Sequence, residues 1–366
     1  MHTESKAGDS SDAARAHGAA GRLVVVGVGG AGVNAVAHLA DHGLGGVRLV
    51  AMDTSAQSLA RAAAARRVLL GGAARGLGTG GRSATGLAAA RAALDAIREA
   101  VAGADVALVV AGLAGGTGGG AAPEVARAAR SEGVVAMGFG IEPFAFENGA
   151  RRRAADAARS ALAAACDATV CLETARAEVL AADALPLDVA LRVADDVLRQ
   201  AVEGLLALTA APSWVDVGRA TVRHVLTDAG PSCLALGLGR GGSPAEAAMR
   251  AALASPLADM RLLAEAGRAM VHVAGGRDLA VRDVEQALCL LRARLPVCCE
   301  VSVGCGLAPS LQGAAQVTLI ASRGRSARQA AEGVGRGAEP RRERSHDAGH
   351  SALRSLWLGV PIREAV

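Results

Sequence analysis

Two glycine-rich segments constrain the fold of this chain more than any other feature, because each follows an apolar run and precedes an alanine-rich run. The first is Val26–Asn34, with the sequence VGVGGAGVN, and the second is Gly112–Pro123, with the sequence GLAGGTGGGAAP. Glycine lets a backbone approach an anion closely, and the N-terminus of a following helix adds the positive end of its dipole. One such loop is typical of a phosphate site. Two together predict a di- or triphosphate held from both sides.

Short β-rich runs alternate with alanine-rich stretches through the first half of the chain. We expect strands at Leu23–Gly27, Val47–Met52, Val68–Leu70, Val106–Ala111, Val134–Phe139 and Thr169–Leu172. This alternation predicts right-handed crossovers and a parallel, doubly wound α/β sheet. Ligands of such sheets bind beyond the carboxyl ends of the strands, where both glycine-rich segments fall.

A long helix follows, since apolar residues repeat at spacings of four and three from Leu187 to Leu208. We expect it to join the first domain to a second, smaller α/β domain. The second domain is predicted to hold strands at Cys233–Leu238, Ala269–Ala274, Val301–Val303 and Val317–Ala321, with helices at Pro244–Ala254 and Val281–Arg292. The predicted division is therefore an N-terminal extension (1–20), a nucleotide-binding domain with the long helix (21–210), a second domain (211–322) and a linker with a tail peptide (323–366).

The charge of the chain is concentrated in its C-terminal segment. The net charge is +4, and residues 321–366 contain nine arginines against five acidic residues. The rest of the chain is close to neutral, which argues against nucleic-acid binding by its folded domains. Residues 1–20 and about 323–350 lack apolar periodicity and are predicted to be disordered. The uncharged run 106–123 contains six glycines, so we expect a strand and a loop there and no membrane insertion.

The seven cysteines show no C-x-x-C spacing, and several lie in apolar runs. We therefore expect buried free thiols in a reducing cytoplasm and no metal site.

The first glycine-rich segment alone leaves several functions open. It contains G-x-G-x-x-G, and Asp53 ends the next predicted strand, where a dinucleotide-binding fold would hold a ribose. An NAD-dependent oxidoreductase and a purely structural turn are both compatible with it. The second segment disfavours the oxidoreductase, which needs no further phosphate loop, and the absence of G-x-x-x-x-G-K-[ST] excludes an ordinary P-loop.

The combined motifs resemble the tubulin/FtsZ superfamily, and its FtsZ branch in particular. The second segment matches the family pattern GGGTGTG followed by AAP, and the first matches GVGGGGGNAV. Further matches, in the family's order, lie at Ala51–Gln57, Gly76–Gly80, Pro143–Glu147, Ala194–Leu198, Glu246–Ala248, Ser255–Leu257 and Gly275–Leu279. The resemblance covers about residues 21–322. It implies a Rossmann-like GTPase domain, a long central helix and a smaller α/β domain.

The resemblance also implies a site for GTP or GDP, with Mg²⁺ as a further ligand. The residues implied to contact phosphates are Gly29, Gly30, Asn34, Gly115, Gly116, Thr117 and Gly118. Glu147 and an arginine at Arg151 or Arg152 would reach the ribose. Asp196 would accept hydrogen bonds from the guanine edge, although a solvated helix charge is the other interpretation of this residue.

Several departures from the family pattern fall on groups that handle the γ-phosphate. Gly119 replaces the second threonine of the tubulin-type loop, and Ser55 replaces an aspartate of the segment after the second strand. Leu191 replaces the phenylalanine that packs against the base in the family. Each change removes a group expected to contact the nucleotide.

The loop after the long helix departs further. The family inserts N-x-D-x-x-D into the next subunit's pocket, where the acids help to activate water. Here Trp214 takes the asparagine position and Asp216 the first acid. The second acid becomes Arg219, or Thr221 if two residues are inserted, and neither side chain can act as a carboxylate base.

Two functions therefore remain open within the family. One is an assembling GTPase for cell division with weak hydrolysis supported by Asp216. The other is a catalytically inactive paralogue that binds GTP structurally and modulates a second FtsZ polymer. Arg219 is either a cation that reaches a neighbour's γ-phosphate or a solvated loop residue. Both functions imply head-to-tail filaments, alone or as a co-polymer, in the cytoplasm, with the division site as a further expectation. The tail, Ser355–Arg363, loosely resembles the family's peptide for division partners, with an inert end as the alternative.

Overall fold

The computed structural model describes residues 23–62, 65–71, 76–144, 146–173, 187–209, 213–215, 218–255 and 257–324, and structural statements refer to these ranges. Side chains 187–194, 209, 213–215, 218 and 219 also lie outside the description. The predicted N-terminal extension, the tail peptide and Asp216 fall outside these ranges.

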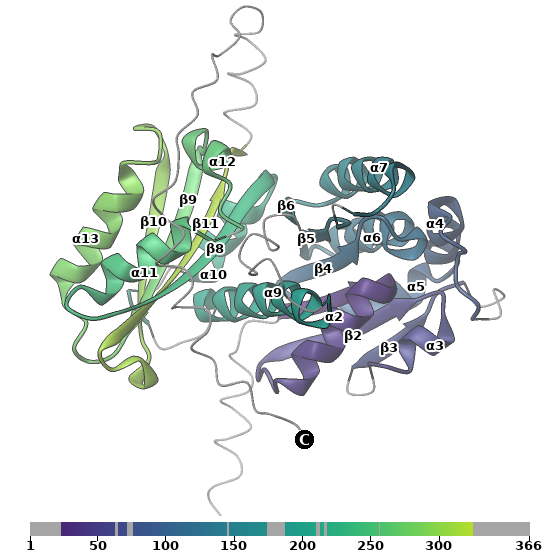
Figure 1. Ribbon diagram of the computed structural model, residues 1–366, viewed down its shortest axis with the longest axis horizontal. Helices are drawn as coiled ribbons and strands as arrows, with labels where there is room; N and C mark the ends of the chain where they lie inside the picture. Colours follow the sequence, from purple (N-terminus) through teal and green to yellow (C-terminus); the bar gives the residue numbers. More distant parts are fainter. Residues whose placement is uncertain are drawn as a thin grey trace, which may run out of the picture.

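The N-terminal half is a parallel sheet with helices on both faces (Figure 1). Its strands are β1 (Leu23–Val28), β2 (Val47–Asp53), β3 (Arg66–Leu69), β4 (Val106–Gly112), β5 (Val135–Ile141) and β6 (Ala168–Leu172). They lie in the order β3-β2-β1-β4-β5-β6, and all neighbours pair in parallel. This confirms the predicted doubly wound sheet.

The two faces of this sheet bury alternate residues, because successive side chains of a strand point to opposite sides. Val25 packs toward α2 (Gly29–Asp41) and α9 (Leu187–Thr209), with the short α3 (Ala56–Leu59). Val24 packs toward the opposite face. The helices there are α4 (Ser83–Ala92), α5 (Leu94–Val101), α6 (Gly116–Ser131) and α7 (Gly149–Ala165).

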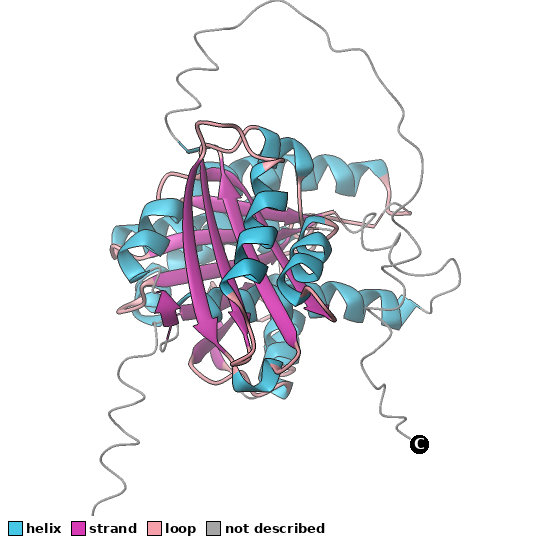
Figure 2. Ribbon diagram, turned by 90° about the vertical axis from the view of Figure 1, so that its left-hand side faces the viewer, coloured by secondary structure: helices cyan, strands magenta, loops and turns pink. Residues whose placement is uncertain are grey.

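The C-terminal half carries a second, largely antiparallel set of strands (Figure 2). They are β7 (Ser213–Val215), β8 (Gly230–Arg240), β9 (Arg268–Gly275), β10 (Glu300–Leu307) and β11 (Ala314–Ser322), in the order β8-β11-β9-β10-β7. Its helices are α10 (Gly218–Leu226), α11 (Pro244–Leu253), α12 (Met260–Ala264) and α13 (Val281–Arg292), with a 3₁₀ turn at Pro309–Leu311. The four predicted strands and two predicted helices are present. The sequence analysis missed β7, α10 and α12.

The long helix α9 lies between the two halves (Figure 1). Its predicted apolar stripe is buried at Leu198, Ala201, Leu205 and Leu208, within one core that includes residues from both sets of strands. A short parallel pairing of β6 with β8, Ala168 with Gly230 and Thr169 with Pro231, joins the strands into one sheet.

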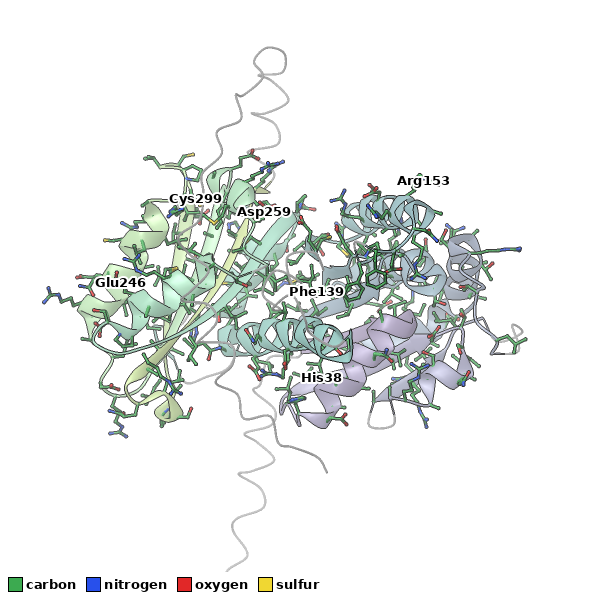
Figure 3. All side chains as sticks on the ribbon, viewed as in Figure 1. His38, Phe139, Arg153, Glu246, Asp259 and Cys299 are labelled. Carbon is green, nitrogen blue, oxygen red and sulfur yellow. The ribbon has the colours of Figure 1, made fainter. Side chains whose placement is uncertain are left out.

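The cysteine prediction was only partly right. Cys166 and Cys233 are buried, whereas Cys289 and Cys298 are exposed. Figure 3 places Phe139 in the N-terminal half and Cys299 in the C-terminal half.

Within the described residues, no helix is long and apolar enough to span a membrane.

Candidate functional site

Two helices begin side by side at the carboxyl ends of neighbouring strands. Helix α2 starts at Gly29, directly after β1, and α6 starts at Gly116, shortly after β4. Neither helix has a side-chain hydrogen bond at its N-cap or an acidic residue in its first turn. The first-turn N–H groups and the positive dipole ends of both helices are therefore left for another anion.

The two glycine-rich segments touch, and glycine is required at the contact. Gly29 has a φ of +74°, a conformation that side chains rarely adopt. A Cβ at Gly29 would lie 2.7 Å from the backbone nitrogen of Gly118. A Cβ at Gly116 would lie 2.3 Å from Oγ1 of Thr79. The site thus brings three separate segments together without room for a side chain at Gly29 or Gly116.

A cavity of about 350 Å³ opens over these helix starts. Its lining includes eight of the predicted site residues. They are Gly29, Gly30, Gly115, Gly116, Thr117 and Gly118 at the floor, with Glu147 at the rim; Arg151, one of the two alternatives for the ribose, lines it too. The volume lies within the range of small-molecule sites.

The acidic residue at the rim is held in place by its neighbours. Oε1 of Glu147 accepts a hydrogen bond from the backbone N–H of Phe144 at 3.0 Å, and Oε2 is ion-paired with Nε of Arg151. Arg152 donates instead to the backbone oxygen of Glu147, at 3.2 and 3.3 Å, and is absent from the cavity lining. Of the two alternatives left by the sequence, Arg151 is the one that lines the cavity.

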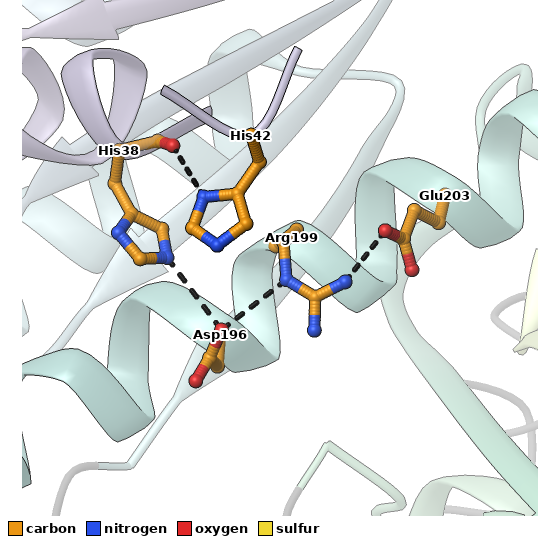
Figure 4. Close-up of polar contacts among 5 residues, drawn as sticks. All are labelled: His38, His42, Asp196, Arg199 and Glu203. Atoms are coloured by element: carbon orange, nitrogen blue, oxygen red, sulfur yellow. Dashed lines mark hydrogen bonds and ion pairs between the residues drawn. The ribbon is translucent and has the colours of Figure 1, made fainter. Parts of the chain in front are cut away.

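Two predicted residues lie farther along α2 and α9. Asn34 is one turn after Gly30 and accepts a hydrogen bond from Nη1 of Arg61 at 3.3 Å. Asp196 lies on α9, where Oδ1 is 3.2 Å from Nε of Arg199 and 3.5 Å from Nε2 of His38 (Figure 4). Neither lines the cavity. Because residues four apart share a helix face, Gly30, Asn34 and His38 mark one stripe from the cavity toward Asp196.

The acid beside Asp196 has an altered pKa. Burial raises the pKa of Asp195 above its ordinary value, the nearby charge of Asp196 acts in the same direction, and His38 opposes the shift. This part of α9 is therefore a partly desolvated, acidic surface facing α2.

Sequence reasoning missed two groups that line the cavity. Thr79 belongs to the GLGTG segment, which was matched to the family but given no role, and Glu142 follows β5. The sequence did contain a signal for Thr79, because hydroxyl and backbone groups in a glycine-rich turn often face an anion. Glu142 could be placed only once β5 was known to end at the cavity.

The departures from the family pattern have local structural causes. Oγ of Ser55 accepts from the N–H of Ser58 at 3.2 Å and caps α3. A Cβ at Gly119 would lie 2.8 Å from the oxygen of Leu113, so a threonine would not fit without a shift.

Asp53, the residue that a dinucleotide-binding fold would use for a ribose, is 3% exposed. Its Oδ1 accepts a hydrogen bond from the N–H of Thr54 at 2.7 Å. This buried carboxylate is not placed to bind a ribose.

The predicted loop of the next-subunit contact is described in part. Trp214 lies on β7 and Arg219 on the first turn of α10, with both side chains outside the description, as is Asp216. The side chain of Leu191 is likewise outside it. From Asp196 to Thr209 the helix α9 advances about 20 Å. This stretch of α9 therefore separates Asp196 from the start of the loop.

Known proteins resemble the chain over both halves. Residues 22–177 match the tubulin/FtsZ family, GTPase domain, and residues 230–323 match the FtsZ family, C-terminal domain. Cell division protein FtsZ of Caulobacter vibrioides is 34% identical over 302 residues, which are 82% of this chain and 59% of that relative. The chain thus spans less than two thirds of the length of this curated relative.

Solved structures also resemble the chain over most of its length. An empty FtsZ dimer from M. jannaschii is 30% identical with a TM-score of 0.76, and the match covers 86% of this chain and 91% of that one. CetZ2 from Haloferax volcanii, solved as a GTPγS-bound protofilament, is 23% identical with a TM-score of 0.67, covering 85% and 98%. The likeness to CetZ2 shows the fold alone.

Proposed function

Because this chain belongs to the FtsZ family, we propose that it binds GTP and assembles head-to-tail into filaments for cell division. The observation that carries this proposal is the pair of uncapped helix starts, α2 and α6, that meet under one cavity. Their N–H groups and dipoles fit a chain of phosphates held from both sides. The cytoplasm, at the division site, is the place that this function requires.

We assign the phosphates to Gly29, Gly30 and the segment Gly115–Gly118. Glu147 and Arg151 stand at the rim, where the ribose would lie. Asn34 was expected at the phosphates, but it lies one turn beyond the cavity floor, so we assign it to the nucleoside. Asp196 would accept from N1 and N2 of guanine, which gives the site a physical reason to prefer guanine.

Mg²⁺ enters this proposal as an ion carried by the nucleotide. The carboxylates that line the cavity are Glu142 and Glu147, and both are already ion-paired, with Arg159 at 3.8 Å and with Arg151. Mg²⁺ in nucleotide sites takes much of its coordination from phosphates and water. When bound, it would neutralise phosphate charge.

The hydrolytic step would need two chains. The residues that line the cavity lie between Val28 and Arg151, so we propose that the acid of the loop after α9 is supplied by a neighbouring chain in a head-to-tail contact. Such contacts generate open filaments. With Asp216 as the remaining acid of that loop, we propose that GTP hydrolysis is weak.

The second candidate is a paralogue that binds GTP without hydrolysing it and modifies another FtsZ polymer. The observation that favours it is Arg219, which stands in the first turn of α10 where the family carries an acid. A cation near a neighbour's γ-phosphate would hold subunits together without orienting water.

One paired experiment separates these functions. The purified full chain is incubated with GTP or GDP, pelleted, and assayed in parallel for phosphate release. Pelleting with turnover supports the GTPase, and GTP-dependent pelleting without turnover supports the paralogue, which is then mixed with a motif-complete FtsZ. Absence of guanine nucleotide binding by calorimetry contradicts both.

A further inference from the structure

A cluster of two imidazoles and one carboxylate joins α2 to α9 outside the cavity. His38 lies in the last turn of α2, His42 caps the helix, and Asp196 comes from α9. One ligand atom from each residue lies within 4.8 Å of the other two (Figure 4). Nothing in the proposed nucleotide chemistry uses the two histidines, whereas Asp196 is assigned there to guanine, so a cation and the base would compete for this carboxylate.

We propose that His38, His42 and Asp196 form a binding site for a divalent cation of the Zn²⁺ class. The three side chains are of the types that bind such an ion. Imidazole nitrogen is a ligand for Zn²⁺ and its neighbours in the transition series, whereas Mg²⁺ and Ca²⁺ prefer oxygen. Two histidines and one carboxylate form a three-ligand zinc set, with the fourth position open to water.

The spacing of His38 and His42 also fits a metal site. Histidines at i and i+4 face the same side of a helix, as they do in helical zinc motifs. The third ligand then comes from the helix that faces this stripe. Tetrahedral Zn²⁺ at bond lengths of about 2.0 Å brings its ligand atoms to about 3.3 Å apart. The cluster, with its ligand atoms within 4.8 Å of one another, needs a closure of up to about 1.5 Å, and the exposed ring of His42 can supply it by rotation.

Each of the two rings has a nitrogen that a metal could bind. Nδ1 of His42 lies 2.8 Å from the backbone oxygen of His38, so this nitrogen carries the proton and Nε2 keeps its lone pair for a metal. Nε2 of His38 is buried without a hydrogen bond, and its ion-pair partner Asp196 is 3.5 Å away. A cation between them would satisfy both atoms.

Asp196 can be released from its present partner. Arg199 contacts Asp196 through Nε, but Nη1 of the same guanidinium is bound to Glu203, one turn farther along α9. Arg199 therefore keeps a carboxylate partner when Asp196 turns to a metal. The result is a cation that ties the end of α2 to α9.

The test is a titration of the full chain, with reduced thiols and no nucleotide, by ZnCl₂ in competition with a chromophoric chelator. We expect a Zn²⁺ equivalent that millimolar Mg²⁺ does not displace. His42→Gln and His38→Gln should each weaken this equivalent by more than about 100-fold, the upper range for losing only an outer-shell partner. Two variants are used because Nε2 of His38 is buried, so His38→Gln could disturb the fold. His42 is exposed, and its replacement leaves the core intact.

The matched control is His224→Gln. His224 is also an exposed histidine beside a carboxylate, with Nε2 3.7 Å from Glu300, but it has no second imidazole in a described cluster. Its variant should titrate like the original chain. The proposal is overturned if both His38→Gln and His42→Gln keep the original Zn²⁺ titration, or if His224→Gln loses the same equivalent. Because nucleotide is absent, either result is independent of the proposed GTP site.

Discussion

The hydroxyl groups of Thr54 and Thr117 lie 2.7 Å apart in a buried hydrogen bond. Thr54 follows β2, and Thr117 is the second residue of α6, so the bond ties the start of a phosphate-facing helix to a neighbouring strand end. Thr54 is 1% exposed and Thr117 is 7% exposed. The threonine that the sequence assigns to phosphate binding thus also positions the loop around it.

Replacing Thr117 with valine should destabilise the fold and weaken nucleotide binding. The change leaves the buried Thr54 hydroxyl without its close partner, which costs about 1–3 kcal/mol. Thr117→Ser keeps the hydroxyl and should lose less. In a chemical-denaturation cycle, Thr54→Val/Thr117→Val should lose less than the sum of the single changes, because both polar partners are gone. Strict additivity would show that the two hydroxyls do not interact.

Gly29→Ala should abolish GTP binding. The new methyl group would meet the backbone of Gly118, and the residue would be held at φ +74°. The matched control is Gly133→Ala, where φ is +73° and nothing lies within 4 Å of the added carbon. Both variants should lose about 1–2 kcal/mol from the backbone conformation. Calorimetry with GTP should separate them, and equal GTP affinity in the two variants would contradict a phosphate role for Gly29.

Asp196→Ala should lower discrimination between GTP and ITP, which lacks the exocyclic amine. A hydrogen bond between that amine and a carboxylate is worth about 1.5–3 kcal/mol, so the original chain should prefer GTP by about tenfold or more. The variant should bind both nucleotides with similar affinity. Asp156→Asn, an exposed acid on α7, serves as the control for net charge. A preference for GTP that survives in Asp196→Ala would remove this residue from the guanine edge.

A site shared between subunits predicts complementation. Gly29→Ala damages the cavity but leaves the loop with Asp216, whereas Asp216→Asn does the reverse. Each variant alone should release phosphate more slowly than the original chain. A mixture should exceed the average of the two, because one type of contact pairs an intact cavity with an intact loop. If the mixture only averages, the two elements do not act across a subunit contact.

Acidification should destabilise the fold through His272. Burial lowers the pKa of this side chain below its ordinary value of about 6.5. The unfolded chain therefore takes up the proton first, and the stabilisation present above about pH 6.5 is lost as the pH falls through the folded-state pKa. His272→Leu should show a shallower loss of unfolding free energy between about pH 7 and pH 5. An identical slope in both chains would contradict the prediction.

The sequence predicted the first half well because its strands are continuous apolar runs between glycine-rich turns. The same reasoning missed β7 and α10. Strand β7 is only three residues long and exists through its pairing with β10, at Val215 with Cys305 and Ser213 with Gly306. Such a segment has too little local pattern to be distinguished from a loop.

The candidate site was predicted unevenly for a similar reason. Glycine-rich loops are easily recognised in a sequence, since few other residues allow close backbone contacts. The glycines predicted to contact phosphate line the cavity. The choice between Arg151 and Arg152 was beyond the sequence, because it depends on how α7 begins at Asn148, whose side chain caps the helix. The cluster of His38, His42 and Asp196 was also invisible, because its third member comes from a helix more than 150 residues later.

The pairing of β6 with β8 has a mechanical consequence. These strands share two residue pairs, Ala168 with Gly230 and Thr169 with Pro231, whereas β8 and β11 share nine. A twist of one half against the other would strain this seam first and leave the interior of each half intact. We therefore expect twisting between the two halves to occur beside α9. Force applied to one half would then reach the other through this helix.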